Sequence, residues 1–142
     1  MEAISARAEK AVEYKHNRCN CAQPVLMAYE KELGRPAEDI LTMGSGFGSG
    51  MGGMEGTCGA LCGAVMALGL LNKSDTPSKM IAKDMLQDFK EMSGGATICR
   101  DLKGIGTGKM LCACDDCVRH GVLVLEKKLA GINGWARWNI LW

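Results

Sequence analysis

The sequence is poor in aromatic residues, in proline and in net charge. It has three tryptophans, two tyrosines, two phenylalanines and three prolines in 142 residues, and its formal net charge is +1. No run of basic residues is present. Proteins that bind DNA or RNA need clustered lysines and arginines, with aromatic rings for stacking. The composition therefore indicates that nucleic acid is not a partner.

Long hydrophobic runs are missing as well. The longest apolar run, residues 58–71, is shorter than the about 20 residues that cross a bilayer and has the length of a buried core helix. Residues 1–14 alternate charged residues with alanine and lack the apolar core of an export signal. We expect no membrane span and no export signal.

Strand patterns are missing too, since no stretch alternates apolar and polar residues over more than a few positions. Apolar residues instead recur at helical spacing. We predict an all-α fold, a compact helical bundle of about five to six helices, in which a glycine-rich loop leads into a buried central helix. At 142 residues the chain is expected to form a single domain, residues 1–142.

What the sequence does have is a loop made mostly of glycine, residues 44–53, followed by a helix without charge, residues 58–71. A helix that is apolar on every side is buried. Thr57 is its expected N-cap, which puts Cys58 in the first turn. Free N–H groups and the positive end of the helix dipole lower the pKa of a thiol there and favour the reactive thiolate.

Glycines at this density indicate a backbone that uses positive φ or lies close to another group. Gly48, Gly50, Gly52 and Gly53 are candidate cofactor-binding positions, because a nest of backbone N–H groups can hold cluster sulfides or a small anion. Close packing against another helix explains the same glycines equally well.

Two later helices have clear apolar faces. The first begins after residues 75–77, and its expected buried residues are Met80, Ile81, Met85, Leu86, Phe89 and Met92. The last long helix has Val118, Val122, Leu125 and Leu129 on one face. His16 and His120 lie near cysteines, and we expect both to be solvated surface residues.

Eight cysteines dominate the chemistry of the chain. Without an export signal they indicate a reducing compartment, and we expect the cytoplasm, where such clusters bind metals or act in redox reactions. Four of them, Cys21, Cys58, Cys99 and Cys117, each fall in the first turn of a different predicted helix. We predict that these four form the site, with Cys19, Cys62, Cys112 and Cys114 as secondary thiols.

The sequence resembles the C_GCAxxG_C_C family of redox-active proteins. Five blocks carry the resemblance: Cys21-Ala22-Gln23-Pro24-Val25-Leu26, Gly46-Phe47-Gly48-Ser49-Gly50-Met51-Gly52, Cys58-Gly59-Ala60-Leu61-Cys62-Gly63, Cys99-Arg100-Asp101-Leu102 and Cys117-Val118. It covers about residues 5–130. The resemblance implies a small helical redox-active protein, and the family's four hallmark cysteines match Cys21, Cys58, Cys99 and Cys117.

A tail at about residues 131–142 lies outside the resemblance and carries three tryptophans. We expect these rings to cover the protein's own core, with a homodimer contact as the alternative.

Three functions fit these residues. The leading hypothesis is an electron-transfer protein that holds an iron–sulfur cluster through Cys21, Cys58, Cys99 and Cys117, and that serves an unidentified redox partner protein. The first alternative is a thiol–disulfide redox enzyme in which Cys58 is the nucleophile. The expected disulfide joins Cys58 to Cys21, or Cys114 to Cys117. The second is a structural zinc-binding module.

Overall fold

The computed structural model describes residues 5–132 of the chain. The tryptophan-rich tail, and with it the expected packing or dimer role of its rings, falls outside the described residues. Nine helical elements follow one another in the described part: α1 (Ala6–His16), α2 (Gln23–Ala28), α3 (Glu30–Leu33), α4 (Ala37–Gly44), η1 (Gly50–Met54), α5 (Gly59–Leu71), α6 (Ser78–Met92), α7 (Cys99–Lys103) and α8 (Cys114–Leu129).

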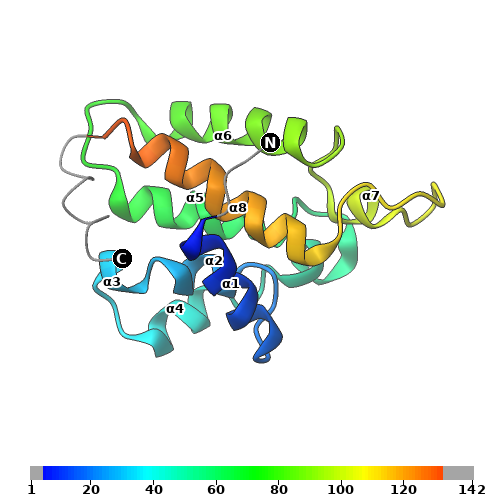
Figure 1. Ribbon diagram of the computed structural model, residues 1–142, viewed down its shortest axis with the longest axis horizontal. Helices are drawn as coiled ribbons and strands as arrows, with labels where there is room; N and C mark the ends of the chain where they lie inside the picture. The colour runs from blue at the N-terminus through cyan, green and yellow to red at the C-terminus, as the bar shows by residue number, and fades with distance from the viewer. Residues whose placement is uncertain (1–4, 133–142) are drawn as a thin grey trace.

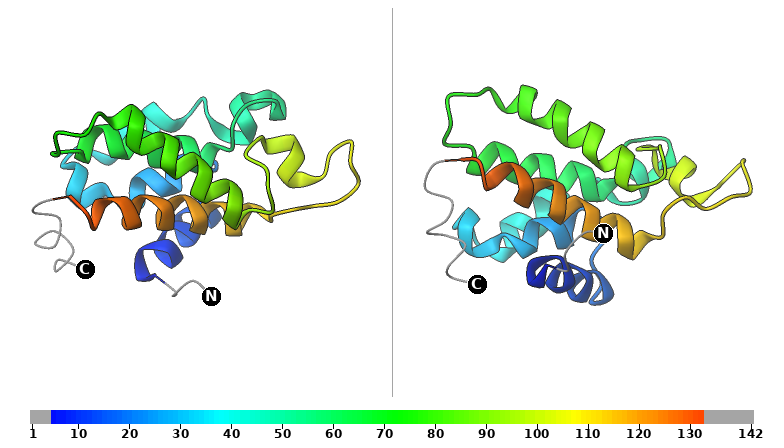
Figure 2. Two further views of the ribbon diagram at one scale, coloured as in Figure 1. Left: turned by 90° about the horizontal axis from the view of Figure 1, so that it is seen from above. Right: turned by 45° about the horizontal axis from the view of Figure 1, so that its top comes forward.

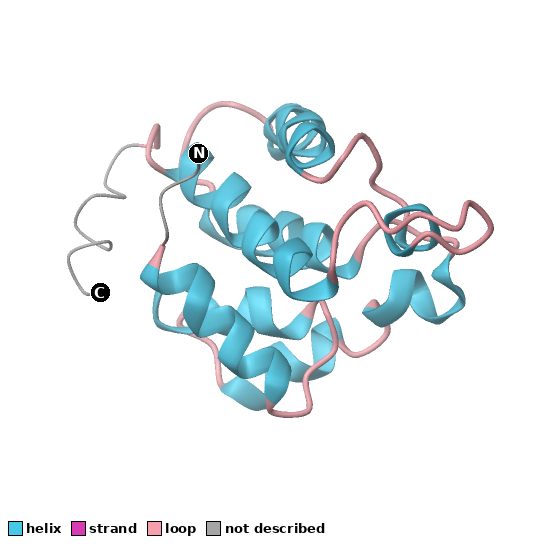
Figure 3. Cartoon of the chain, turned by 45° about the vertical axis from the view of Figure 1, so that its right-hand side comes forward, coloured by secondary structure: helices cyan, strands magenta, loops and turns pink. Residues whose placement is uncertain are grey.

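The all-α prediction is confirmed, since all regular elements within residues 5–132 are helices (Figure 3). There are more of them than the expected five to six. The extra elements are short: α3 has four residues and is separated from α2 by Tyr29 alone, and η1 and α7 have five residues each.

The buried central helix is also confirmed. Figure 1 shows α5 and α8 side by side in the middle of the molecule, with α6 on one side and α1 to α4 on the other. Small residues let the backbones meet: a Cβ on Gly63 would lie 2.5 Å from the Ala22 carbonyl oxygen, and one on Gly121 would lie 2.7 Å from the Ala60 carbonyl oxygen. The α5 helix is therefore held between α2 and α8 by backbone contacts that only glycine allows.

The apolar face of α8 is buried as predicted, with Val118, Val122, Leu125 and Leu129 all fully enclosed. The prediction for α6 is wrong in part. Met85 and Phe89 are buried, but Met80 is 60% exposed and Leu86 is 43% exposed. The reason is that α6 covers α5 and α8 from outside with one narrow face, as the two views in Figure 2 show.

Helix α1 begins at a side-chain cap and is tied to the rest of the protein by buried charge. The Ser5 hydroxyl oxygen accepts the Ala8 N–H at 3.2 Å. Further along α1, the buried Arg7 guanidinium donates to the Ala28 carbonyl oxygen at 2.9 Å and forms an ion pair with the equally buried Glu32 carboxylate. Arg7 therefore joins α1 to the end of α2 and to α3.

None of the helices within residues 5–132 combines the length and the apolar character needed to cross a bilayer.

Candidate thiol site

The Cys58 sulfur lies at the start of α5, buried and surrounded by hydrogen-bond donors. The residue is 4% exposed and is itself the N-cap of the helix. Its sulfur accepts a hydrogen bond from the Cys117 thiol, and the backbone N–H groups of Ala60 and Leu61 also donate to it. These donors outweigh the opposing effect of burial and lower the pKa of Cys58 from 9.0 to about 7.

Thr57 is not the N-cap of α5, so the helix starts one residue later than expected. The reason is a short antiparallel bridge between Thr57 and Ile98. The Cys58 N–H donates to the Thr97 carbonyl oxygen at 2.7 Å, and the Cys99 N–H donates to the Gly56 carbonyl oxygen at 3.1 Å. This bridge places Cys99 beside Cys58.

Cys99 is 5% exposed and begins α7, as predicted, with Ile98 rather than Thr97 as the cap. Its environment differs from that of Cys58. Burial raises the pKa of the Cys99 thiol above 9.0, with a further contribution from repulsion by Cys58. The start of this five-residue helix therefore does not produce the expected thiolate.

Cys21 precedes α2, outside its first turn. A capping box precedes α2: the Asn20 side-chain oxygen accepts the Gln23 N–H at 3.0 Å, and the Gln23 side-chain oxygen accepts the Asn20 N–H at 3.0 Å. Burial, and then charge repulsion from Cys114 and Cys58, raise the pKa of Cys21 to about 11. Cys21 is thus a protonated neighbour of the site at neutral pH.

Cys117 is fully buried and lies in the first turn of α8, which begins at Cys114 with Ala113 as its N-cap. Its thiol interacts through hydrogen bonds with the side chains of both Cys112 and Cys58. These bonds favour the protonated form and raise the pKa of Cys117 above its ordinary range. Cys117 is therefore the proton-holding member of the group.

Lys103 supplies positive charge to these sulfurs. Burial opposes its charged form, but a hydrogen bond to Cys114 and attraction to Cys117 leave the pKa of Lys103 raised. Its charge also lowers the pKa of Cys58. Sequence analysis did not identify this lysine, because it lies on a short helix far along the chain from Cys58.

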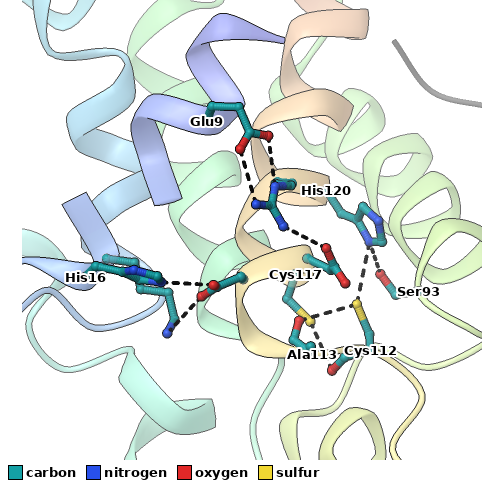
Figure 4. Close-up of polar contacts among 11 residues, drawn as sticks. Glu9, His16, Ser93, Cys112, Ala113, Cys117 and His120 are labelled. Atoms are coloured by element: carbon teal, nitrogen blue, oxygen red, sulfur yellow. Dashed lines mark hydrogen bonds and ion pairs between the residues drawn. The ribbon is translucent and has the colours of Figure 1, made fainter. Parts of the chain in front are cut away.

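A second thiol environment, which the sequence did not reveal, surrounds Cys112. The Cys112 sulfur lies 3.7 Å from the Nδ1 atom of His120, and the same nitrogen lies 2.8 Å from the Ser93 hydroxyl oxygen (Figure 4). Hydrogen bonds from Cys117 and His120 lower the pKa of Cys112 to about 5. His120 is therefore half-buried and held by contacts with Ser93 and Cys112, rather than the solvated surface residue expected.

The remaining cysteines, Cys19, Cys62 and Cys114, are half-exposed. The Cys62 thiol donates to the Thr57 carbonyl oxygen at 3.8 Å, and burial raises its pKa. Cys62 also borders a groove of about 420 Å³ between α5 and α6. The groove is lined by Phe47, Thr57, Leu61, Cys62, Val65, Met66, Ala82, Lys83 and Leu86.

The glycine loop is packed at some positions and open at others. A Cβ on Gly48 would lie 2.6 Å from the Asn20 Cβ, and one on Gly50 would lie 2.6 Å from the Cys99 Cβ. Gly52 and Gly53 have nothing within 4 Å of such an added atom. Close packing thus accounts for Gly48 and Gly50, and a cofactor-binding role for the four glycines stays a prediction.

Positive φ, expected for this loop, extends beyond its glycines. Gly50 and Gly52 adopt it, and so do Ser49 at 51°, Met51 at 62° and Met54 at 64°. L-residues with side chains seldom take this conformation, which costs free energy. The loop next to Cys58 and Cys99 is therefore strained.

All eight cysteines are free thiols. Over residues 5–132, no group of three or more Cys, His, Asp or Glu side chains is arranged to hold a metal ion. Of the four predicted ligands, Cys117 acts most strongly on the pKa of Cys58, whereas Cys21 and Cys99 interact with Cys58 through charge repulsion. The iron–sulfur and zinc hypotheses stay predictions.

Comparison with known proteins gives one match. Residues 19–128 match the model of the family described as "Putative redox-active protein (C_GCAxxG_C_C)". No curated protein and no solved structure matches the chain.

Proposed function

The chain belongs to the C_GCAxxG_C_C family of redox-active proteins, and from that membership we propose that it is a thiol–disulfide redox protein in which Cys58 attacks and Cys117 resolves. The observation that carries the proposal is the close pairing of the buried Cys58 sulfur, at the N-cap of α5, with the buried Cys117 thiol that does most to lower its pKa. It joins a thiolate with a lowered pKa to a second thiol that holds its proton.

The first step forms a mixed disulfide. The Cys58 thiolate attacks one sulfur of a disulfide substrate, and the other sulfur leaves as a thiolate that takes up a proton. The backbone N–H groups of Ala60 and Leu61 and the charge of Lys103 stabilise the thiolate before it attacks.

The second step closes the disulfide within the protein. Cys117 loses its proton, attacks the Cys58 sulfur and releases the second half of the substrate as a thiol. The substrate disulfide gains two electrons, and the two cysteines lose two on forming Cys58–Cys117. The pairs considered from the sequence, Cys58 with Cys21 and Cys114 with Cys117, have less support, because the hydrogen-bond partner of Cys58 is Cys117.

Mass-spectrometric mapping tests this assignment. Reduced protein is treated anaerobically with hydroxyethyl disulfide, quenched with acid and mapped for disulfides. We expect a Cys58–Cys117 bond in the wild type. In Cys117→Ser we expect a mixed disulfide trapped on Cys58, and in Cys58→Ser no mixed disulfide at the start of α5. Cys62→Ser is the matched control, since Cys62 lies on the same helix. A wild-type map without Cys58–Cys117 at the earliest quench time, and without any other disulfide of Cys117 later, would refute the proposal.

The iron–sulfur hypothesis is kept as a second candidate, because Cys21, Cys99 and Cys117 gather around Cys58 from four separate elements. The described side chains do not have the geometry of a metal site, so this candidate requires rearrangement. Anaerobic purification with iron, sulfide and zinc quantified on one sample separates the candidates. Matching iron and sulfide would favour the cluster, and stoichiometric zinc without iron would favour a zinc module.

A further inference from the structure

Cys112 is not one of the four site cysteines predicted from the sequence, and it lies outside the motifs of the family. Its position is nevertheless fixed by the fold. It lies between α7 and α8, where the Leu111 and Cys112 N–H groups donate to the Leu102 carbonyl oxygen at 2.9 and 3.2 Å. The residue is 7% exposed. The thiol is therefore held in the interior by backbone hydrogen bonds on one side and by α8 on the other.

Two side chains fix the surroundings of the Cys112 sulfur: the buried Ser93 at the end of α6 and the half-buried His120 on α8. Ser93, which is 1% exposed, hydrogen-bonds the His120 Nδ1 atom at 2.8 Å, and that nitrogen lies 3.7 Å from the Cys112 sulfur. The His120 ring packs edge-on against Phe89, with 6.2 Å between the ring centroids. The imidazole is thus fixed in orientation, with one nitrogen directed at the thiol.

The Cys117 thiol contacts Cys112 as well as Cys58. The Cys117 sulfur donates to the Cys112 carbonyl oxygen at 3.8 Å, and the Cys112 side chain is the largest cause of the raised pKa of Cys117. Figure 4 shows the Cys112 sulfur between the His120 ring and Cys117. The Cys117 thiol therefore interacts with both the Cys112 and the Cys58 side chains.

We propose that Cys112 is a second disulfide partner for Cys117, so that the disulfide first formed with Cys58 passes to Cys112 by thiol exchange inside the protein. The proposal rests on the thiol–disulfide function proposed above. The Cys112 thiolate attacks the Cys117 sulfur, the Cys117–Cys112 bond forms, the Cys58–Cys117 bond breaks and Cys58 leaves as a thiolate. No electron enters or leaves, so the exchange needs no further oxidant.

The surroundings of the Cys58 thiol and of the Cys112 thiol support exchange in both directions. Cys58 leaves as a thiolate into the backbone N–H groups at the start of α5 and the field of Lys103. Cys112 leaves as a thiolate toward His120 and Ser93. Both leaving groups are stabilised, which is what rapid thiol exchange requires. After the transfer, Cys58 is reduced again, and the disulfide joins Cys112 to Cys117.

Disulfide mapping after limited oxidation tests the exchange. Reduced protein is treated with less than one equivalent of hydroxyethyl disulfide, left for a series of times and quenched with acid. We expect Cys58–Cys117 at early times and a mixture of Cys58–Cys117 and Cys112–Cys117 later. In Cys112→Ser the map keeps Cys58–Cys117 alone, and Cys112→Ala repeats the test without a hydroxyl group. Cys19→Ser is the control and gives the wild-type mixture.

His120→Gln tests the positioning role of the imidazole with a readout that is not activity. Loss of the ring destabilises the free Cys112 thiolate, so the equilibrium share of Cys112–Cys117 rises, roughly tenfold for each pKa unit that the ring contributes. An unchanged ratio would overturn this role of His120.

The failures of the two proposals are distinguishable. If Cys58–Cys117 forms and Cys112 stays alkylatable at all times, the exchange is refuted and the proposed function stands. If neither disulfide forms in the wild type, the proposed function fails. Circular dichroism of each variant shows whether it has folded, and a variant that has not folded is replaced by the second substitution at the same position.

Discussion

Cys58 and Cys117 are both buried, and they have opposite acid–base character because their hydrogen bonds differ. Cys58 accepts from a thiol and from backbone N–H groups, which lowers its pKa to about 7, whereas Cys117 shares its proton with two acceptor sulfurs, which raises its pKa. A helix start alone does not produce this difference, since Cys99 also starts a helix and has a raised pKa.

The Cys58 pKa predicts how its alkylation depends on pH. Only the thiolate reacts, so the rate rises with pH and levels off above the pKa of about 7. Cys117→Ala removes the donor, and the pKa of Cys58 rises toward 9.0. At pH 7 the thiolate fraction and the iodoacetamide rate then fall by up to about 50-fold, and the difference disappears above about pH 10.

Cys117→Ser is the control for that experiment, because a hydroxyl group still donates, and its rate is expected to stay closer to that of the wild type. The rates are measured at Cys58 by peptide mass spectrometry under anaerobic conditions. A Cys117→Ala profile that overlays the wild-type profile would show that Cys117 does not set the acidity of Cys58.

At the scale of the elements, glycines decide how closely α5 approaches its neighbours. Gly63 faces the backbone of Ala22, whereas Gly69 on the same helix has nothing within 4 Å of an added Cβ. Two glycines of one helix therefore have opposite expected responses to alanine.

Gly63→Ala is expected to lower the free energy of unfolding by about 1–3 kcal/mol, because the carbonyl of Ala22 cannot move aside without shifting α2. Gly69→Ala is expected to raise it by about 0.5–1 kcal/mol, since alanine favours the helix and meets open space. Urea denaturation under reducing conditions measures both. Equal stability of the two variants would contradict the packing described here.

Element periodicity explains what could be predicted from the sequence. The uncharged run of α5 and the spacing of Val118, Val122 and Leu125 in α8 predicted two buried helices, because burial follows from local pattern. The start of α6 was also recognisable, since Pro77 precedes Ser78 and fixes the entry to the helix.

The parts of the site that depend on distant segments could not be predicted. The bridge that brings Cys99 beside Cys58 involves one residue pair, Thr57 and Ile98, which is too short to leave a strand pattern. The contact between Ser93 and His120 joins residues 27 positions apart on two helices. Sequence spacing therefore identified the cysteines, and tertiary packing decides which of them meet.

At the scale of the whole molecule, charged contacts join the first helix to the last. The Arg119 guanidinium of α8 donates to the Glu9 carboxylate of α1 at 2.9 Å, and the Asp115 carboxylate lies 2.9 Å from His16, as Figure 4 shows. These pairs are partly exposed and contribute little to stability. The contact between Arg7 and Glu32 is different, because both side chains are buried and water cannot take the place of either one.

Glu32→Gln is expected to destabilise the protein by about 3–5 kcal/mol, since it leaves the buried Arg7 charge without its closest counter-charge. Glu13→Gln is the control. Glu13 lies at the surface, 3.9 Å from the Lys10 amine, and its loss is expected to cost less than about 0.5 kcal/mol. Urea midpoints compare the two variants, and a Glu32→Gln midpoint equal to that of the control would exclude a stabilising role for the pair.

The burial of Cys58, Cys99, Cys112 and Cys117, which are 4%, 5%, 7% and 0% exposed, has a kinetic consequence. A reagent can meet these sulfurs only while the structure around them is transiently open. At low reagent concentration the observed rate is the open fraction multiplied by the intrinsic rate of the thiolate, and it grows linearly with concentration. At high concentration it reaches a plateau equal to the opening rate, identical for every reagent. Any reaction at the Cys58 sulfur can then proceed no faster than the structure around it opens.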